Sequence, residues 1–122
     1  LLRQVKSVAS NRGYLIGLDG RQLFVRSEHG ALNVLLQSCA AIIAKQWVHL
    51  IDLEIKRQEL PATIIAFVHD EIQISVQQQK EGVADHVGTL TRRMAAEAGR
   101  TFDFSVPIAA EYSVGRNWAD TH

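Results

Sequence analysis

The sequence predicts an α+β fold, in which a small antiparallel sheet has a long helix and a second helix packed on it from one side. Three patterns in the 122 residues support this prediction. Apolar side chains recur every three or four positions across residues 27–60, which is the period of a helix. Residues 72–76 alternate apolar and polar side chains, which is the period of a strand. An Asp-Gly pair at residues 19–20 separates two apolar runs, which is typical of a hairpin turn.

The first 26 residues are expected to form a lead-in helix and a hairpin. The helix would span residues 1–12 and close near Gly13, and residues 14–26 would form the hairpin. Ser27 then suits the N-cap of the long helix, because its hydroxyl can accept a hydrogen bond from an amide of the first turn. That helix continues to about Gln58, and Pro61 prevents it from going further.

The second half of the chain is expected to hold the sheet. Residues 63–68 are short, apolar and β-branched, which predicts a buried strand, and residues 72–76 predict a half-buried one. A second helix is expected from about Gln79 to Ala98, with Gly99 at its C-terminal cap. A further strand is expected where apolar residues alternate again, at Phe102, Phe104, Val106 and Ile108.

Length and composition limit the organisation and the class of function. The chain suits a single partial domain over residues 1–122, made of parts 1–26, 27–60 and 61–122, with 47% apolar residues to build a core. Its formal net charge is zero, whereas independent nucleic-acid-binding modules usually carry a basic surface. No apolar run approaches the roughly 18–20 residues of a membrane span, so we expect no membrane contact. Residue 1 is leucine and Met94 is the only methionine, which favours a piece of a longer chain.

Three ionisable residues, His69, Asp70 and Glu71, are expected where the two strands meet. A tight turn holds neighbouring carboxylates on a rigid platform, and Mg²⁺ is often bound by one or two carboxylates together with substrate phosphates. A two-metal phosphoryl-transfer site needs such carboxylates. The other interpretation is a solvated polar turn, because a three-residue motif is weak by itself.

A row of polar residues lies along the predicted long helix. His29, Asn33 and Gln37 are spaced four apart and therefore share one face. All three side chains can donate and accept hydrogen bonds, so the row could follow a DNA minor groove, whose acceptors are alike for every sequence. The other interpretation is the solvent-facing side of an amphipathic helix.

Four segments, taken in order, resemble family A (DNA polymerase I-like) DNA polymerases. VHDEIQ at residues 68–73 resembles the family's motif C, and LNVLLQS at 32–38 resembles the start of its long palm helix. GLDGR at 17–21 resembles the preceding hairpin, and GRNWADTH at 115–122 resembles the C-terminal tail. The resemblance covers residues 14–122, and the phage T7-like branch looks nearest. It implies the C-terminal part of a polymerase palm.

The family's residue roles carry over position by position. The resemblance implies that Asp70 binds the catalytic Mg²⁺ ions, that Glu71 is an auxiliary carboxylate, and that His69 contacts the primer strand. It implies that Asn33 and Gln37 touch the minor groove of the duplex. DNA-binding residues would thus include His69 and, at a position where bacterial members carry arginine, His29. Primer-template DNA and deoxynucleoside triphosphates would be the partners, and the C-terminal His122 with its carboxylate would lie near the site.

The family's motif A, with the other metal-binding aspartate, and motif B, which holds the nucleotide, have no match here. The chain is therefore expected to be inactive alone and to need the N-terminal polymerase portion, in the same chain or in a split partner. Self-association and a location in the cytoplasm or nucleoid of a bacterium or phage-infected cell are further expectations. The alternatives are a non-catalytic subunit of a split polymerase that binds DNA or a partner, a small metal-dependent hydrolase that adds His49, Asp52 and His86, and a degenerate remnant with a structural role.

Overall fold

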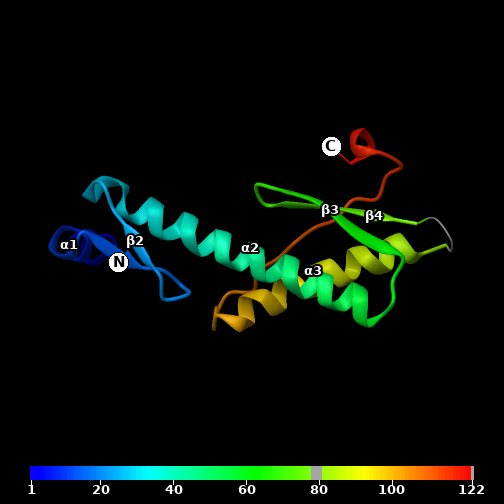
Figure 1. Cartoon of the computed structure of the whole chain (residues 1–122), viewed down its shortest axis with the longest axis horizontal. Coiled ribbons are helices and arrows are strands. Elements are labelled where there is room, and N and C mark those ends of the chain that lie inside the picture. Colours follow the sequence, from blue (N-terminus) through cyan, green and yellow to red (C-terminus); the bar gives the residue numbers. More distant parts are fainter. Residues whose placement is uncertain (78–80, 122) are drawn as a thin grey trace. The chain divides into compact units, whose positions relative to one another are not determined.

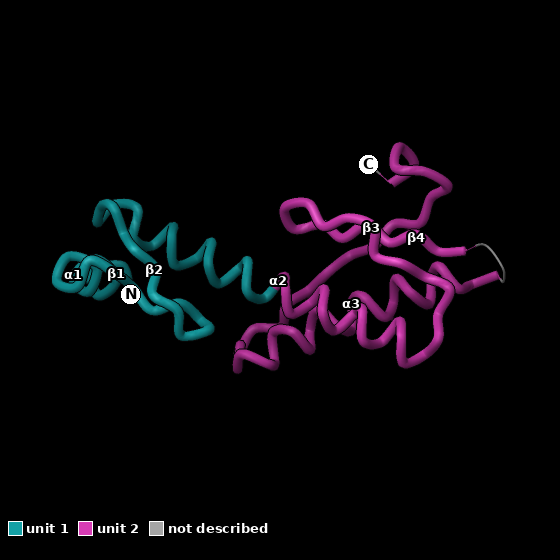
Figure 2. Tube along the Cα trace, viewed as in Figure 1, with its two compact units in different colours: residues 1–43 teal, residues 44–122 magenta. Residues whose placement is uncertain are grey.

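The computed structural model describes residues 1–77 and 81–121, which form two compact units, residues 1–43 and 44–122 (Figure 2). The mixture of helices and small antiparallel sheets confirms the predicted α+β class. Each unit is described by itself, and the expected division at residues 26 and 60 stays a prediction. The elements, in chain order (Figure 1), are helix α1 (Leu2–Arg12), strands β1 (Tyr14–Ile16) and β2 (Gln22–Phe24), the 3₁₀ turn η1 (Glu28–Gly30), helix α2 (Ala31–Arg57), strands β3 (Ala62–Val68) and β4 (Glu71–Val76), helix α3 (Val83–Thr101) and the 3₁₀ turn η2 (Trp118–Asp120).

The unit formed by residues 1–43 has the predicted helix and hairpin. Helix α1 closes at Gly13, whose φ of 73° lies in the left-handed region that glycine adopts without strain. Strands β1 and β2 are antiparallel, and Leu15 lies opposite Leu23. The buried apolar residues of this unit make its core: Val5, Ala9, Leu15 and Ala31.

Both ends of α2 follow local rules. The Ser27 hydroxyl accepts a hydrogen bond from the Gly30 amide at 3.3 Å, so the predicted residue is a cap, but it caps the 3₁₀ turn η1 that leads into α2 and not α2 itself. At the other end Glu59 has a φ of 51°, and the Leu60 amide donates to the Ile55 carbonyl at 3.0 Å. This is a Schellman ending with glutamate at the left-handed position, and it stops the helix before Pro61.

One helix in the described part of the chain, Glu28–Arg57, is long and apolar enough to cross a membrane by length and composition alone. Its 18-residue window has a mean hydropathy of 1.4, which corrects the expectation that no segment approaches a span. The expectation failed because uncharged residues such as Asn33 and Gln37 interrupt the apolar run without adding charge. Core helices of soluble proteins pass the same test, so the expected lack of membrane contact stays a prediction.

In the unit formed by residues 44–122, helices pack on one face of the β3–β4 sheet. The buried centre is Ile51, Ile55, Leu90 and Met94, which come from α2 and α3. Apolar residues of both strands pack against it: Ala62, Ile64, Ile72 and Ile74. The indole Nε1 of Trp47 also donates to the Thr91 carbonyl at 2.8 Å and so ties α2 to α3.

Strand β3 is not the buried strand that the sequence predicts. None of its residues is buried, and Ile65, Phe67 and Val68 are 65%, 39% and 47% exposed. The sheet has two strands in the described residues, so a strand apolar enough for burial on both faces has only one face covered. A bulge at Ile65 also shifts the register, because Ile64 pairs with Ile74 whereas Ala66 pairs with Gln73.

Helix α3 differs from its predicted limits. It begins at Val83 after Gly82, and the expected start at Gln79 lies outside the described residues. Gly99 is not the cap but a buried residue inside the helix, where a Cβ would come within 2.8 Å of Cγ1 of Ile108. The helix ends instead through Asp103, whose φ is 56°. Gly99 therefore serves close packing against Ile108 and does not terminate the helix.

The strand expected across residues 102–108 does not form. Instead, this segment and its continuation lie against α3, with Ile108 at Gly99 and the ring of Tyr112 at Gly88. An alternating pattern needs a neighbouring strand to become a ladder, and Pro107 lacks the amide hydrogen that a ladder uses.

The C-terminal motif folds into a tight loop. The Asp120 carboxylate accepts from the Arg116 amide at 2.8 Å and from Nδ2 of Asn117 at 3.3 Å. Gly115 leaves room for the Asp120 side chain, which a Cβ there would overlap. His122 lies outside the described residues.

Candidate active site

The β3–β4 hairpin ends in a two-residue turn made of His69 and Asp70, closed by the pair Val68–Glu71. His69 has a φ of 56°, the left-handed region that glycine usually occupies at the first position of such turns. A non-glycine residue there costs on the order of 1–3 kcal/mol and is found preferentially at functional sites. The tight turn fixes the Asp70 backbone at the tip of the hairpin.

The three predicted site residues at this tip are exposed. Glu71 begins strand β4 and accepts a hydrogen bond from Nε2 of Gln73. The side chains of His69 and Asp70 make no hydrogen bond or ion pair with any other described residue. An exposed carboxylate without a partner, next to a second carboxylate, is available for a hard cation or for a substrate.

The donor set at the tip fits part of a magnesium site. Asp70 supplies the carboxylate oxygens that Mg²⁺ prefers, and Glu71 adds a second acidic group. Within residues 1–77 and 81–121, no group of three or more His, Cys, Asp or Glu side chains could hold a metal ion. Two residues that the hydrolase alternative would add are engaged elsewhere: Asp52 pairs with Lys56 at 2.6 Å, and His86 contacts Gln58 at 2.8 Å.

The predicted polar row belongs to the unit of residues 1–43, whereas the hairpin belongs to the other unit. Asn33 and Gln37 are exposed and lie one turn apart on α2. His29 is exposed as well, but it lies in the 3₁₀ turn that precedes α2. Asn33 and Gln37 therefore have the α-helical spacing that the sequence predicts, whereas His29 lies in a 3₁₀ turn and does not belong to the same α-helical row.

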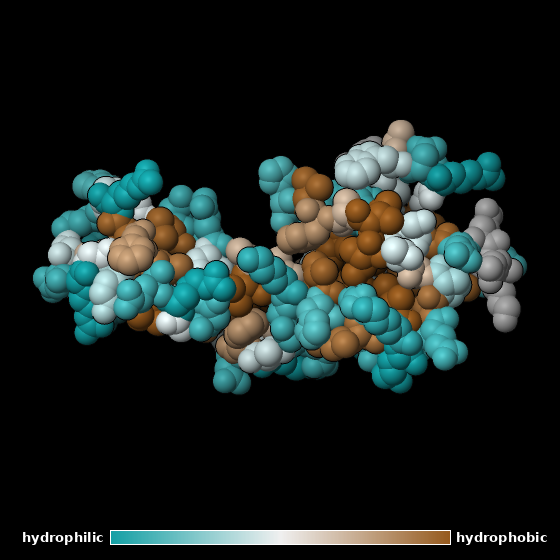
Figure 3. Space-filling model, viewed as in Figure 1, coloured by the Kyte–Doolittle hydropathy of each residue, from teal (hydrophilic) through white to brown (hydrophobic). Residues whose placement is uncertain are grey.

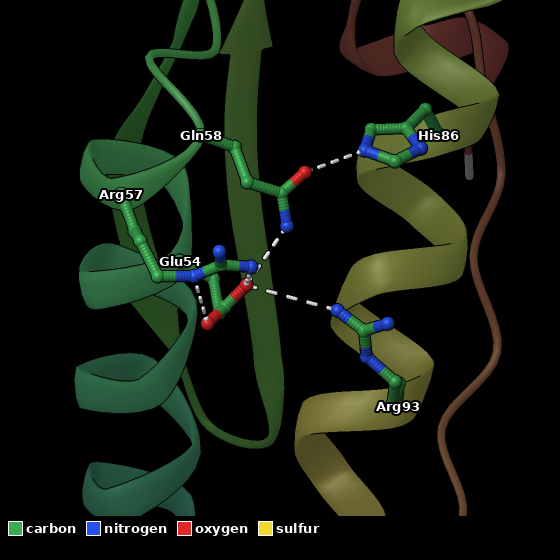
Figure 4. Close-up of polar contacts among 5 residues, drawn as sticks. All are labelled: Glu54, Arg57, Gln58, His86 and Arg93. Carbon is green, nitrogen blue, oxygen red and sulfur yellow. Dashed lines mark hydrogen bonds and ion pairs between the residues drawn. The ribbon is translucent and has the colours of Figure 1, made fainter.

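A polar network that the sequence did not single out joins the end of α2 to α3 (Figure 4). The Glu54 carboxylate accepts from Nε and Nη2 of Arg57 at 2.8 and 2.7 Å, and from Nε2 of Gln58 at 2.8 Å. Arg93 lies 3.7 Å from the same carboxylate, and Gln58 also contacts His86. The hydrogen bonds from Arg57 and then Gln58 lower the pKa of Glu54 to about 2. Arg57 and Gln58 follow Glu54 by three and four residues, and this helical spacing is the sequence signal that predicts their contacts with Glu54.

The hairpin with an acidic tip and the helices that pack on the sheet are features that the resemblance to family A polymerases implies. The sequence profile of DNA polymerase family A matches residues 3–120. The chain belongs to DNA polymerase family A, as the motifs predicted.

Relatives include phage and bacterial polymerases. The DNA-directed DNA polymerase of Escherichia phage T7 is 33% identical over 129 residues, which cover 96% of this chain and 17% of the relative. The corresponding enzyme of Enterobacteria phage T3 is 32% identical, again over 96% of this chain and 17% of the relative. A solved POL domain of Pol1 from M. smegmatis, in complex with DNA primer-template and dNTP, has a TM-score of 0.83 and 29% identity, covering 98% of this chain and 22% of that one. The chain thus spans about a sixth of the phage relatives.

Proposed function

We propose that this chain is the motif C segment of a DNA-directed DNA polymerase palm, which takes part in template-directed nucleotidyl transfer. The observation that carries the proposal is the exposed Asp70 carboxylate at the tip of a strained two-residue turn, in a chain of this family. The M. smegmatis relative was solved with primer-template DNA and dNTP, which supports these as the partners of the complete enzyme.

Each predicted site residue has a role in this proposal. Asp70 would hold catalytic Mg²⁺, and Glu71 and His69 would help to place the 3′ end of the primer. Asn33 and Gln37 contact the minor groove of the new duplex, with His29 beside them on η1. When bound, Mg²⁺ would supply charge stabilisation for the attacking and leaving oxygens of phosphoryl transfer.

We further propose that the activity needs the portions that this sequence does not match, motifs A and B. One aspartate without a nucleotide-binding clamp supplies only part of a two-metal site. Exposed apolar side chains such as Ile65 and Val68 support contact with the N-terminal polymerase portion, and would promote self-association of the 122-residue chain alone. The corresponding location is the cytoplasm or nucleoid of a bacterium or phage-infected cell.

The test is Asp70→Asn in the full protein as its gene encodes it. Primer extension should fall by about three orders of magnitude, because several kcal/mol of metal-dependent stabilisation is lost. Affinity for primer-template DNA, measured by fluorescence anisotropy, should stay near the wild-type value. The control is Asp103→Asn, the same change at an exposed aspartate with a φ of 56°, which asparagine tolerates.

Extension by Asp70→Asn at a rate close to that of Asp103→Asn would remove Asp70 from the catalytic site. A normal rate in a protein that has no motif A or B anywhere in its gene would exclude the proposal that the activity needs these motifs. No primer extension by the wild-type full protein would exclude the polymerase proposal as a whole. Loss of DNA binding together with extension would instead favour the non-catalytic binding role.

A further inference from the structure

A second surface of the unit formed by residues 44–122 has the features of a binding site. A pocket of about 260 Å³ lies between α3 and the segment that follows it. It shares no residue with the hairpin tip. Its lining consists of Thr89, Arg92, Arg93, Ala109 and Ala110.

Two glycines of α3 help to build this pocket. The C-terminal segment touches α3 at Gly99 through Ile108 and at Gly88 through the ring of Tyr112. Residues 109–110 lie between these two contacts and are therefore held beside the helix. On α3, positions 89, 92 and 93 are spaced three and four apart and share one face. The two sides of the pocket, α3 and residues 109–110, are thus held together by these contacts. A larger residue at Gly88 or Gly99 would disturb them.

The lining offers hydrogen-bond donors and no carboxylate. Arg92 and Arg93 each carry a guanidinium group and Thr89 carries a hydroxyl, and Figure 4 shows the Arg93 group directed towards Glu54 on α2. The backbone amides of Ala109 and Ala110 form no hydrogen bond with another residue in the described part of the chain. Such amides need a partner from solvent or from a ligand.

Neither arginine is held by a close ion pair with a described carboxylate. Arg93 lies 3.7 Å from the Glu54 carboxylate, whose oxygens already accept from Arg57 and Gln58 at 2.7–2.8 Å. Arg92 forms no ion pair with any carboxylate in the described ranges.

Nearby acidic groups do not cancel this charge. Glu97 is paired with Arg100, and the Asp85 carboxylate accepts a long hydrogen bond of 3.4 Å from the Tyr112 hydroxyl. Glu111 follows the lining residue Ala110 on the exposed C-terminal segment but does not line the pocket.

We propose that this pocket binds a phosphate group through the guanidinium groups of Arg92 and Arg93. The planar fork of arginine matches the oxygens of phosphate, and charge-assisted hydrogen bonds of this kind are strong. The phosphate comes from a polynucleotide backbone or from a free anion such as inorganic phosphate or pyrophosphate. The site goes beyond the proposed function, because it needs neither Asp70 nor Mg²⁺.

The experiment uses the full protein in buffer with EDTA, so that metal-dependent binding at the hairpin tip is absent. Inorganic phosphate and pyrophosphate are titrated by calorimetry, and a fluorescein-labelled oligothymidylate is titrated by anisotropy. In the double variant Arg92→Gln/Arg93→Gln, affinity for at least one probe should fall by about tenfold or more, because two charge-assisted contacts are lost. Circular dichroism confirms that the exposed substitutions leave the fold intact.

The matched control is Arg100→Gln, which removes the same charge from the same helix outside the pocket. It should leave the affinity for each probe near the wild-type value. A loss confined to oligothymidylate assigns the site to a polynucleotide backbone, and a loss for phosphate or pyrophosphate assigns it to the free anion. Unchanged affinity for all three probes in the double variant, or an equal loss in Arg100→Gln, would overturn the proposal.

Discussion

The two ends of the β3–β4 hairpin differ in how much of their surface is covered. At the base, Ala62, Ile64 and Ile74 pack against helices α2 and α3. At the tip, every residue from Phe67 to Glu71 is exposed, and Figure 3 shows uncovered apolar surface on this unit. The base therefore holds the hairpin, while the tip presents a strained turn and two carboxylates. Stability and the proposed chemistry are supplied by opposite ends of one element.

The largest expected effect comes from substituting two isoleucines, one buried at the base and one exposed on β3. Ile51 is fully buried under the base, and Ile65 is 65% exposed. Ile51→Ala should lower the free energy of unfolding by about 2–5 kcal/mol, because it removes buried methylenes and leaves a cavity. Ile65→Ala should change it by less than about 0.5 kcal/mol. Urea denaturation of both variants measures the two values, and equal losses would show that the tip side of β3 is as well covered as the base.

Gly88→Ala tests the packing of the C-terminal segment by the sign of its effect. A Cβ at Gly88 would overlap the Tyr112 ring, so the variant should be less stable by about 1–3 kcal/mol. In a Tyr112→Ala background the same change should stabilise by about 1 kcal/mol, because alanine favours a helix interior over glycine. Thermal denaturation of the four proteins gives the coupling. Stabilisation by Gly88→Ala alone would mean that the ring does not lie on this glycine.

A pair of substitutions at His69 separates the strain of the tip from its chemistry. Both His69→Gly and His69→Val remove the imidazole, but only valine is strongly disfavoured at a φ of 56°. His69→Val should therefore be about 1–2 kcal/mol less stable than His69→Gly. Chemical denaturation measures the difference, and primer extension by the full protein should fall in both. Equal stabilities would contradict the left-handed turn.

The smallest effect concerns the network behind the base. The pKa of Glu54 is lowered from 4.5 to about 2, so its ionised form stabilises the fold above pH 4.5, and this contribution is lost as the pH falls from 4.5 towards 2. Glu54→Gln should therefore lower Tm at neutral pH, and the Tm values of wild type and variant should converge near pH 2. Glu97→Gln, which removes a carboxylate paired with Arg100 alone, is the control. A Tm difference between wild type and Glu54→Gln that is independent of pH would exclude the carboxylate as its source.

The parts of the fold that local rules decide could be predicted from the sequence. Ser27 as a cap, Gly13 as a stop and the turn at residues 69–70 depend on neighbours in the chain, and the structure has them. The conformation of residues 102–108 depends on long-range packing. The alternation predicts a strand, but the end of this segment packs on α3 at Gly99 instead. The exposure of β3 and the bulge at Ile65 depend on long-range pairing in the same way.

The candidate site shows the same division. Asp70 and Glu71 stand out because charges between two apolar strands are unusual, and four motifs in order added the family. Arg92 and Arg93 give no such sign, since two adjacent arginines on an amphipathic helix are ordinary. Their common pocket exists only because the chain returns along α3 after residue 102.

The bulge at Ile65 makes the hairpin modular. The pairing is continuous from Ala62 to Ile64 and again from Ala66 to Val68, so two short ladders meet at one irregular residue. Because a one-residue slip reverses which side chains face the core, an insertion in an unbroken ladder would turn the whole tip over. Here the irregularity already absorbs one residue between base and tip. The bulge therefore separates the register of the base, which packs on the helices, from the register of the tip, which presents the carboxylates.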